Sequence, residues 1–335
     1  MFFQSLTGFP EISPDFVREN IELHENSMTS KVNGRTFQHG TLEVVSLQDL
    51  RDQTKALHFS HKISVDQIVG NVQNLHVNEE NRHGLFQAAS QFNLLEMVNP
   101  QGTPEAGIDI YENDRTQGPA CAIACAAGTI YRNYFALVNG KIGQSQFNQI
   151  DGLELFGAYF ENSKRQLWEM TNGYALFNEV GLHYINTVIS QLSPQELEDL
   201  KGKLKIGIQW NTEVTLAENP EQIVSQIYCS ALPIGYTPHI PVPLFEKFAR
   251  LILEATYEAT FLAGLMNIAN GGSPKVFLTL VGGGVFQNNS DWILDAIYKS
   301  ALKFKNSPLE IKIVSYGEAN PKIEKWLKKM KSDPA

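Results

Sequence analysis

The feature that most constrains this chain is an apolar run that ends in three consecutive glycines, Gly282-Gly283-Gly284. The run itself, residues 276–281, consists largely of β-branched, aromatic and leucine residues, which favours a buried strand. A helical pattern begins near Asn289 or Ser290. A strand, a glycine loop and a helix N-terminus in this order direct several backbone N–H groups to one point, where they can hold a phosphate or diphosphate.

The residues after the glycines exclude the common nucleotide motifs. A P-loop requires Gly-Lys-Ser/Thr at this place so that a lysine and a hydroxyl reach phosphate and Mg²⁺, but the chain has Val285-Phe286-Gln287. The glycine spacing of a dinucleotide fingerprint and the Gly-x-Ser-x-Gly elbow of serine hydrolases are also missing from the sequence. The chain is therefore not a standard kinase, dehydrogenase or serine hydrolase, and a simple turn remains the alternative to an anion loop.

The composition is that of an ordinary globular protein, with 43% hydrophobic and 19% charged residues. The net charge of −9 argues against nucleic acid or an anionic membrane as the main partner. No apolar run approaches the roughly 20 residues of a membrane span, and the first residues lack the pattern of a signal peptide. Three cysteines make no disulfide framework. We therefore expect a cytoplasmic protein, or one delivered into a host cell as an effector.

Strand-like segments alternate with helical patterns along the chain. Strands are predicted over residues 41–46, 85–89, 205–210 and 309–314, and helices start at capping or proline signals. The predicted helix starts include Ser64 with Gln67, Pro119 before a helix to Tyr134, and Asn219-Pro220. This alternation predicts an α/β fold with a mixed, largely parallel sheet covered on both faces. We expect one elaborated domain over 1–335, with an N-terminal extension over 1–40 and a core over 41–330.

A second group of polar residues lies in the middle of the chain. The loop over 103–119 holds Glu105, Asp109, Glu112 and Asp114, with Arg115 beside them. A helix of small residues follows, and its start at Gly118-Pro119 offers free backbone N–H groups. Solvated turn or capping roles are the alternative for each carboxylate. Cys121 and Cys125 share a helical face but have no partner at a familiar metal spacing, so no metal site is predicted.

Two segments resemble a known family. The stretch from Leu280 to Asn288, followed by Trp292-Ile293 and a strand ending at Tyr316-Gly317, resembles the second half of a macrodomain. The segment Asp114 to Cys121, with Tyr131 to Phe135 after it, is similar to the larger macrodomain relatives around poly(ADP-ribose) glycohydrolase. The resemblance implies a three-layer α/β/α fold with helical additions, an ADP-ribose ligand and no cofactor.

The resemblance also implies roles for single residues. Asn93 would orient the distal ribose, and Tyr316 would lie by a ribose or the adenine. The residues implied to bind the ligand are Asn93, Gln117, Gly282, Gly283, Gly284, Val285, Phe286, Asn288 and Tyr316, of which the run from Gly282 to Phe286 would hold the diphosphate.

Hydrolysis of an N-glycosidic bond needs carboxylates that stabilise positive charge or activate water. Asp109 and Asp114 are the predicted catalytic carboxylates, with Glu105 in reserve and Arg115 paired to one of them. The Gln-Glu-Glu of poly(ADP-ribose) glycohydrolases does not occur in the sequence. We therefore expect an ADP-ribosyl glycohydrolase that removes mono-ADP-ribose from a modified protein, with arginine-linked ADP-ribose on ubiquitin as one candidate. A non-catalytic ADP-ribose reader and a protein-interaction adaptor are the alternatives.

Overall fold

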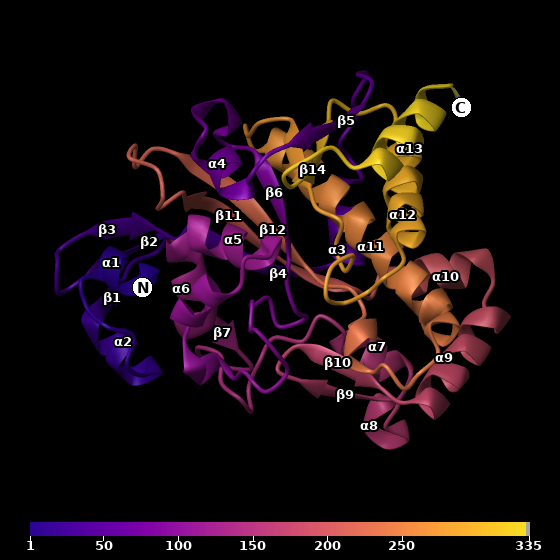
Figure 1. The fold of residues 1–335 in the computed structure, drawn as a ribbon, viewed down its shortest axis with the longest axis horizontal. Helices are drawn as coiled ribbons and strands as arrows, with labels where there is room; N and C mark the ends of the chain where they lie inside the picture. The colour runs from indigo at the N-terminus through magenta and orange to yellow at the C-terminus, as the bar shows by residue number, and fades with distance from the viewer. Residues whose placement is uncertain (333–335) are drawn as a thin grey trace.

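A seven-stranded sheet forms the centre of the protein in the computed structural model, which describes residues 1–332 (Figure 1). All neighbours from β12 to β5 are parallel, whereas β11 is antiparallel to both β4 and β12. The predicted α/β class with a mixed, largely parallel sheet is therefore confirmed. The strands in spatial order are β4 (Thr41–Ser46), β11 (Lys205–Glu213), β12 (Ile223–Cys229), β6 (Leu85–Ala89), β13 (Lys275–Leu278), β14 (Glu310–Ser315) and β5 (Ser64–Val69).

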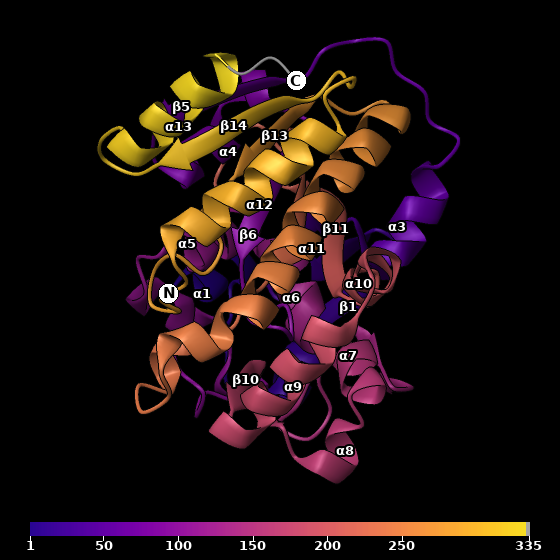
Figure 2. The same ribbon diagram turned by 90° about the vertical axis from the view of Figure 1, so that its right-hand side faces the viewer.

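Helices cover both faces of this sheet. Successive side chains of β6 point to opposite faces and contact helices on each. Gln87 points to one face, where its amide donates to Thr260 Oγ1 of α11 at 2.7 Å. Phe86 and Ala88 point to the other face and pack in one core cluster with Cys121 of α5. The first layer contains α3 (Leu47–Thr54), α11 (Val242–Ala269), α12 (Ser290–Lys303) and α13 (Pro321–Ser332), and the second α4 (Val72–Val77), α5 (Gln117–Ala124) and α6 (Ala126–Tyr134) (Figure 2).

The predicted N-terminal extension folds on the outer side of α6 (Figure 1). It contains α1 (Phe2–Thr7), α2 (Pro14–Asn20) and a small antiparallel sheet of β1 (Ile21–Leu23), β2 (Ser27–Ser30) and β3 (Thr36–Gln38). Phe3, Phe9 and Phe37 share a core cluster with Ile130 and Tyr134 of α6. The extension is thus joined to the second helical layer by apolar packing, while the single-domain organisation stays a prediction.

Residues 137–201 add hairpins and helices below and to the right of the sheet in the view of Figure 1. These elements are β7 (Leu137–Val138), β8 (Lys141–Ile142), α7 (Glu154–Tyr159), α8 (Asn162–Arg165), β9 (Trp168–Thr171), β10 (Tyr174–Phe177), α9 (Glu179–Gln191) and α10 (Pro194–Lys201). Both α9 and α10 pack against α11. Among the helices of residues 1–332, none has the length and apolarity needed to cross a bilayer.

Three predictions of local structure are wrong. Ser64 and Gln67 lie in β5, which pairs with β14 from Ser64 to Val69, and the helix begins only at Val72. Asn219-Pro220 lies in a turn before β12 instead of opening a helix. The predicted helix from Pro119 to Tyr134 is broken at Cys125, whose φ of −118° and ψ of 59° are not helical.

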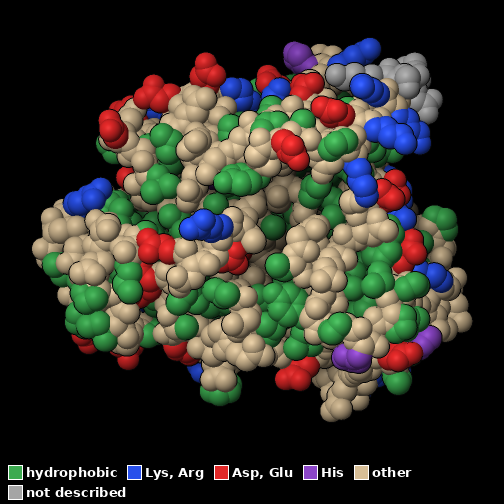
Figure 3. Space-filling view, viewed as in Figure 1, with side chains coloured by type: hydrophobic (Ala, Val, Ile, Leu, Met, Phe, Trp, Pro, Cys, Tyr) green, Lys and Arg blue, Asp and Glu red, His purple; other side chains and the backbone are tan. Residues whose placement is uncertain are grey.

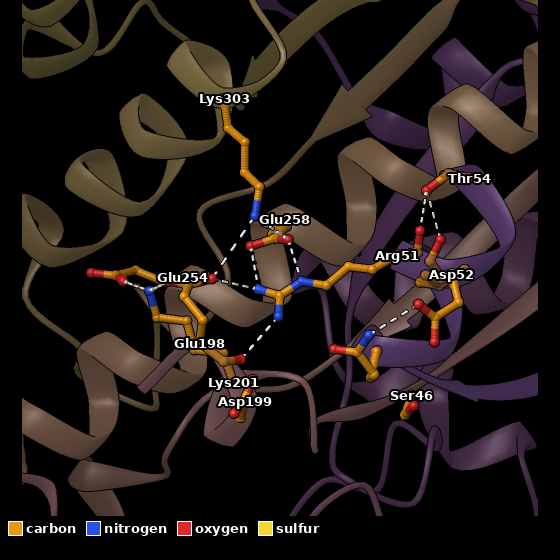
Figure 4. Close-up of polar contacts among 12 residues, drawn as sticks. Ser46, Arg51, Asp52, Thr54, Glu198, Asp199, Lys201, Glu254, Glu258 and Lys303 are labelled. Carbon is orange, nitrogen blue, oxygen red and sulfur yellow. Dashed lines mark hydrogen bonds and ion pairs between the residues drawn. The ribbon is translucent and has the colours of Figure 1, made fainter. Parts of the chain in front are cut away.

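A cluster of ion pairs ties the first helical layer together (Figure 4). Arg51 of α3 contacts Glu258 of α11 at 2.6 Å and Glu198 of α10 at 2.7 Å. Lys303 of α12 contacts the same Glu258 oxygen at 2.6 Å. Burial raises the pKa of Glu258, but the hydrogen bonds from Arg51 and Lys303 outweigh it, so that the pKa lies below its usual range.

Candidate functional site

A cleft of about 1230 Å³ opens at the carboxyl ends of the parallel strands. Its lining includes residues that follow five of them, namely Gly70, Ser90, Ala231, Thr279 and Tyr316. Figure 3 shows a hollow near the centre of this face, with charged side chains at its edge. This is the edge at which α/β proteins bind ligands, and the volume exceeds the roughly 300–1,000 Å³ of common small-molecule sites. The cleft is therefore the candidate site, with room for an extended ligand.

The glycine loop forms one wall of the cleft and leaves donors free. The loop closes on itself, because Gly283 N–H donates to Leu280 O at 2.9 Å and Asn288 N–H donates to Gly282 O at 2.9 Å. Within residues 1–332, the N–H groups of Gly284, Val285 and Phe286 donate to no protein acceptor. Three successive free N–H groups in a loop favour an anionic ligand.

Gly282 and Asn288 fix the shape of this loop. Gly282 has a φ of +78°, and a Cβ there would lie 2.5 Å from Ala231 Cβ, so the position requires glycine. The buried Asn288 amide donates to Leu232 O at 2.8 Å and to Gly282 O at 3.3 Å. Asn288 therefore supports the loop from behind.

The structure separates the residues predicted to bind the ligand. The cleft lining contains Gln117, Gly282, Gly284, Val285, Phe286 and Tyr316. Gly283 is exposed in the same loop. Asn93 is fully buried, where its amide donates to Gln149 Oε1 at 2.7 Å and its Oδ1 accepts from Leu95 N–H at 3.1 Å. Asn93 thus shapes the turn after β6, and a ribose contact by this side chain stays a prediction.

The carboxylates of the acidic loop over 103–119 make different contacts. Asp114 lines the cleft, and its Oδ1 accepts from Thr116 N–H at 2.8 Å. Asp109 accepts from Phe3 N–H at 3.0 Å, and Glu105 accepts from Gln146 N–H at 2.9 Å. These two carboxylates brace backbone N–H groups of other segments, whereas Asp114 is the predicted catalytic carboxylate that reaches the cleft lining.

Arg115 also lines the cleft, but it does not make the predicted ion pair. Within residues 1–332, no carboxylate lies within ion-pair distance of its guanidinium. Nor do these residues contain a group of three or more His, Cys, Asp or Glu side chains placed to hold a metal ion.

Glu96 is a candidate that the sequence did not single out. It lines the cleft, yet only 3% of it is exposed, and among the described residues Oε1 has no hydrogen-bond partner. Burial raises its pKa well above the usual range; Arg132 acts against this and Asp114 adds to it. Burial therefore favours the neutral form of Glu96, which lines the same cleft as Asp114. The sequence signal that could have indicated a buried carboxyl group is a single glutamate inside the apolar run Leu94-Leu95-Glu96-Met97.

Buried polar contacts hold the turn that carries Glu96. Leu94 has a left-handed φ of +64°, and its carbonyl accepts from Arg132 Nε at 3.2 Å. The buried guanidinium of Arg132 lies 3.5 Å from the centre of the Tyr228 ring. On the other side, Met97 N–H donates to Gln91 Oε1 at 2.8 Å and Tyr174 OH donates to Met97 O at 2.7 Å. The turn is therefore pre-organised on both sides of Glu96.

The start of α5 packs directly against Glu96. A Cβ at Gly118 would lie 2.0 Å from Ala89 O and 2.3 Å from Glu96 Oε2, so only glycine fits. The neighbouring Gln117 accepts from Ala89 N–H at 3.1 Å and donates to Gln87 O at 2.8 Å. Gln117 thus continues the hydrogen bonding of β6 and places α5 at the end of that strand.

Three aromatic residues lie together in the cleft wall beside the glycine loop. Tyr174, Tyr236 and Phe286 lie with ring centres 4.9 to 5.7 Å apart, and all three line the cleft. Tyr236 is half-buried and its ring can contact a sugar or a base, whereas Tyr174 and Phe286 are buried and support it.

No family model and no curated protein matches this chain. Among solved structures, it is similar to poly(ADP-ribose) glycohydrolase from Thermomonospora curvata bound to the inhibitor ADP-HPD, with a TM-score of 0.46, 10% identity, and 95% of this chain and 96% of that one covered. It is also similar to the Deinococcus radiodurans enzyme in complex with ADP-ribose, with a TM-score of 0.44, 9% identity, and 87% and 94% covered. Both similarities concern the fold.

Proposed function

We propose that this protein is a hydrolase that removes mono-ADP-ribose from a modified protein. One observation carries the proposal: a single cleft contains the free N–H groups of Gly284, Val285 and Phe286 together with two carboxyl groups in unlike environments, Glu96 and Asp114. The free N–H groups can bind an anionic part of a sugar substrate, and the two carboxyl groups beside them can act in cleavage of its glycosidic bond.

In this proposal the glycine loop holds the diphosphate. The exposed ring of Tyr316, which follows β14, contacts the adenine or its ribose. The distal ribose then lies towards α5, where Glu96 and Asp114 line the cleft. Binding the diphosphate in this way positions the anomeric carbon for reaction.

Glu96 and Asp114 divide the chemistry between them. Neutral Glu96 donates its proton to the atom that links the sugar to the modified side chain, and the bonding pair of the breaking glycosidic bond stays on that atom. Asp114 stabilises the positive charge that develops on the sugar and takes a proton from the attacking water, whose oxygen bonds to the anomeric carbon. The products are ADP-ribose and the free side chain, and solvent returns the proton from Asp114 to Glu96.

The substrate protein that we propose rests on the sequence resemblance alone. The motifs around Asp114 and Gly282 resemble those of the effector MavL, an ADP-ribosyl-ubiquitin hydrolase, and on this resemblance we propose ubiquitin carrying arginine-linked ADP-ribose as the first candidate. The acidic Glu112 and Asp114 at the cleft suit a basic target segment. The missing Gln-Glu-Glu argues against the ADP-ribose polymer as substrate.

The test is release of ADP-ribose from mono-ADP-ribosylated ubiquitin and from proteins with serine, glutamate or polymer linkages, together with calorimetry of free ADP-ribose. We expect Asp114→Asn to lower kcat about 10²- to 10⁴-fold while ADP-ribose binding is retained. Glu105→Gln is the matched control, because Glu105 lies on the same loop but bonds to Gln146 outside the cleft. Tight binding without turnover of any linkage identifies a reader instead, and a wild-type protein that does not bind ADP-ribose refutes the proposal.

A further inference from the structure

We propose that Glu11, in the N-terminal extension, is a positioning residue for the catalytic carboxyls: it holds the short helix η3 (Asp109–Asn113) and, through Tyr111, the backbone of Glu96. This inference rests on the proposed roles of Glu96 and Asp114. Glu11 lies 85 residues before Glu96 in the sequence, and no motif connects the two. The connection is a chain of contacts across the structure.

The first contact is between Glu11 and the start of η3. The Glu11 carboxylate accepts from Ile108 N–H at 2.9 Å and from Asp109 N–H at 2.8 Å. It also accepts from the hydroxyl of Tyr134 on α6 at 2.5 Å. A carboxylate in this position satisfies N–H groups that a helix start leaves unpaired, in the way that a capping residue does. Glu11 therefore fixes η3 from outside the loop.

The backbone of the loop is adapted to this carboxylate. Gly107 has a φ of +84°, and a Cβ there would lie 2.4 Å from Glu11 Oε2. The glycine thus permits both the turn and the close approach of Glu11. A second bond runs in the opposite direction, since Asp109 accepts from Phe3 N–H at 3.0 Å. The extension and the loop are therefore joined by a carboxylate from each side.

Apolar packing makes the same connection rigid. Ile108 and Tyr111 of the loop are fully buried in one cluster with Phe3 and Phe9 of the extension. A side chain enclosed in this way has little freedom to change its rotamer. The position of the Tyr111 hydroxyl is consequently determined by the extension as well as by the loop.

The last contact reaches the catalytic carboxyls. Glu96 N–H donates to the Tyr111 hydroxyl at 3.1 Å, and Asp114 N–H donates to Tyr111 O at 3.1 Å. Tyr111 thus contacts the backbone of both residues. A shift of η3 would move Glu96 and Asp114 relative to each other, and a misplacement of about 1 Å can cost about a hundredfold in rate.

The glycine loop is anchored separately, by contacts of Gly282 and Asn288. Loss of the Glu11 contacts should therefore affect catalysis more than ligand binding. The neighbouring Met97 N–H is also anchored separately, by Gln91 Oε1 at 2.8 Å. This gives a local control within the same turn.

The experiment compares Glu11→Gln, Tyr111→Phe and the double variant with the wild-type chain. We expect each single change to lower kcat on the ADP-ribosylated protein about 10- to 100-fold, with less than about a twofold change in KM and in ADP-ribose affinity. The double variant should lose no more than the worse single variant, because both changes break one chain of contacts. Asp15→Asn is the matched control, since Asp15 lies on the same segment with an exposed side chain that pairs with Arg18.

Amide hydrogen exchange gives a measure that does not depend on turnover. In both single variants, exchange of Glu96 N–H should accelerate at least about tenfold, while exchange of Met97 N–H stays at the wild-type rate. Unchanged Glu96 exchange, additive losses in kcat, or a fall in ADP-ribose affinity that equals the fall in kcat would overturn the inference. If the wild-type chain releases no ADP-ribose but Glu96 exchange responds as expected, the hydrolase proposal fails and the structural connection stands.

Discussion

Replacing Gly118 by alanine tests how closely α5 must approach Glu96. The added Cβ would lie 2.0 Å from Ala89 O and 2.3 Å from Glu96 Oε2. Two such atoms essentially never approach within 3.0 Å, so the contact to Ala89 must lengthen from 2.0 to 3.0 Å, a displacement of about 1 Å. Ala89 O belongs to the backbone of a central strand and cannot turn away. The start of α5, the Glu96 side chain, or both must move.

The size of the effect follows from this displacement. Overpacking of this kind costs about 1–3 kcal/mol of unfolding free energy. A shift of about 1 Å at catalytic groups costs about a hundredfold in rate. Because Gly118 contacts Glu96 but lies outside the glycine loop, we expect kcat to fall much more than ADP-ribose affinity.

The assay is single-turnover release of ADP-ribose, measured alongside urea unfolding and calorimetry of ADP-ribose. Gly157→Ala is the control, because Gly157 also lies in a helix but its added Cβ would meet Trp168 at an ordinary 3.8 Å. We expect that control to be neutral or stabilising by up to about 1 kcal/mol. A Gly118→Ala variant with wild-type kcat and wild-type stability would show that α5 can move away from Ala89 and Glu96 with no loss of unfolding free energy or activity. That result would refute the argument that α5 must pack closely against Glu96.

Two further expectations concern ionisation. Glu96 has a raised pKa in the folded protein. Its contribution to the free energy of unfolding is therefore fully present below the unfolded-state pKa of about 4.3 and is lost as the pH rises through the folded-state pKa. Each tenfold change in the acid dissociation constant between the two states corresponds to about 1.4 kcal/mol. Urea unfolding should therefore show Glu96→Gln gaining stability over wild type between pH 4 and pH 8 while it loses turnover, and a pH-independent difference would contradict this. Glu258 has a lowered pKa, so its contribution is present above about 4.3 and is lost as the pH falls through the folded value. Arg51→Ala should cost about 3 kcal/mol at pH 7 and less in acid, whereas Arg165→Ala, which breaks a more exposed pair, should cost at most about 1 kcal/mol.

Much of the sheet was predictable because its strands carry local signals. The alternation over 41–46 and the buried run over 85–89 correspond to β4 and β6. The strand β12 is not predicted, because nearly all of its residues are buried and its sequence shows no alternation of apolar and polar residues. In addition, Asn219-Pro220 before it has the sequence pattern of a helix start. Ser64 and Gln67 have the spacing of a capping box, but pairing with β14 along the whole of β5 decides their structure.

The site was predictable in part for a similar reason. The glycine loop carries a local signal for anion binding, because strand, glycines and helix follow one another in the sequence. The acidic loop does not reveal which carboxylate turns inward: Asp109 faces the extension and Asp114 the cleft, although both lie among turn residues. Glu96 is defined by the burial that α5 imposes on it, and that contact joins residues more than 20 positions apart.

The cleft wall is assembled from the whole length of the chain, from Phe2 to Pro321. During synthesis the site is therefore completed only after β14 and the residues that follow it have been added. A fragment that lacks either end would lose part of the binding surface. Conversely, an ADP-ribose concentration of about 100 times Kd should stabilise the entire fold by about 2.7 kcal/mol, so that ligand binding can be read from global unfolding.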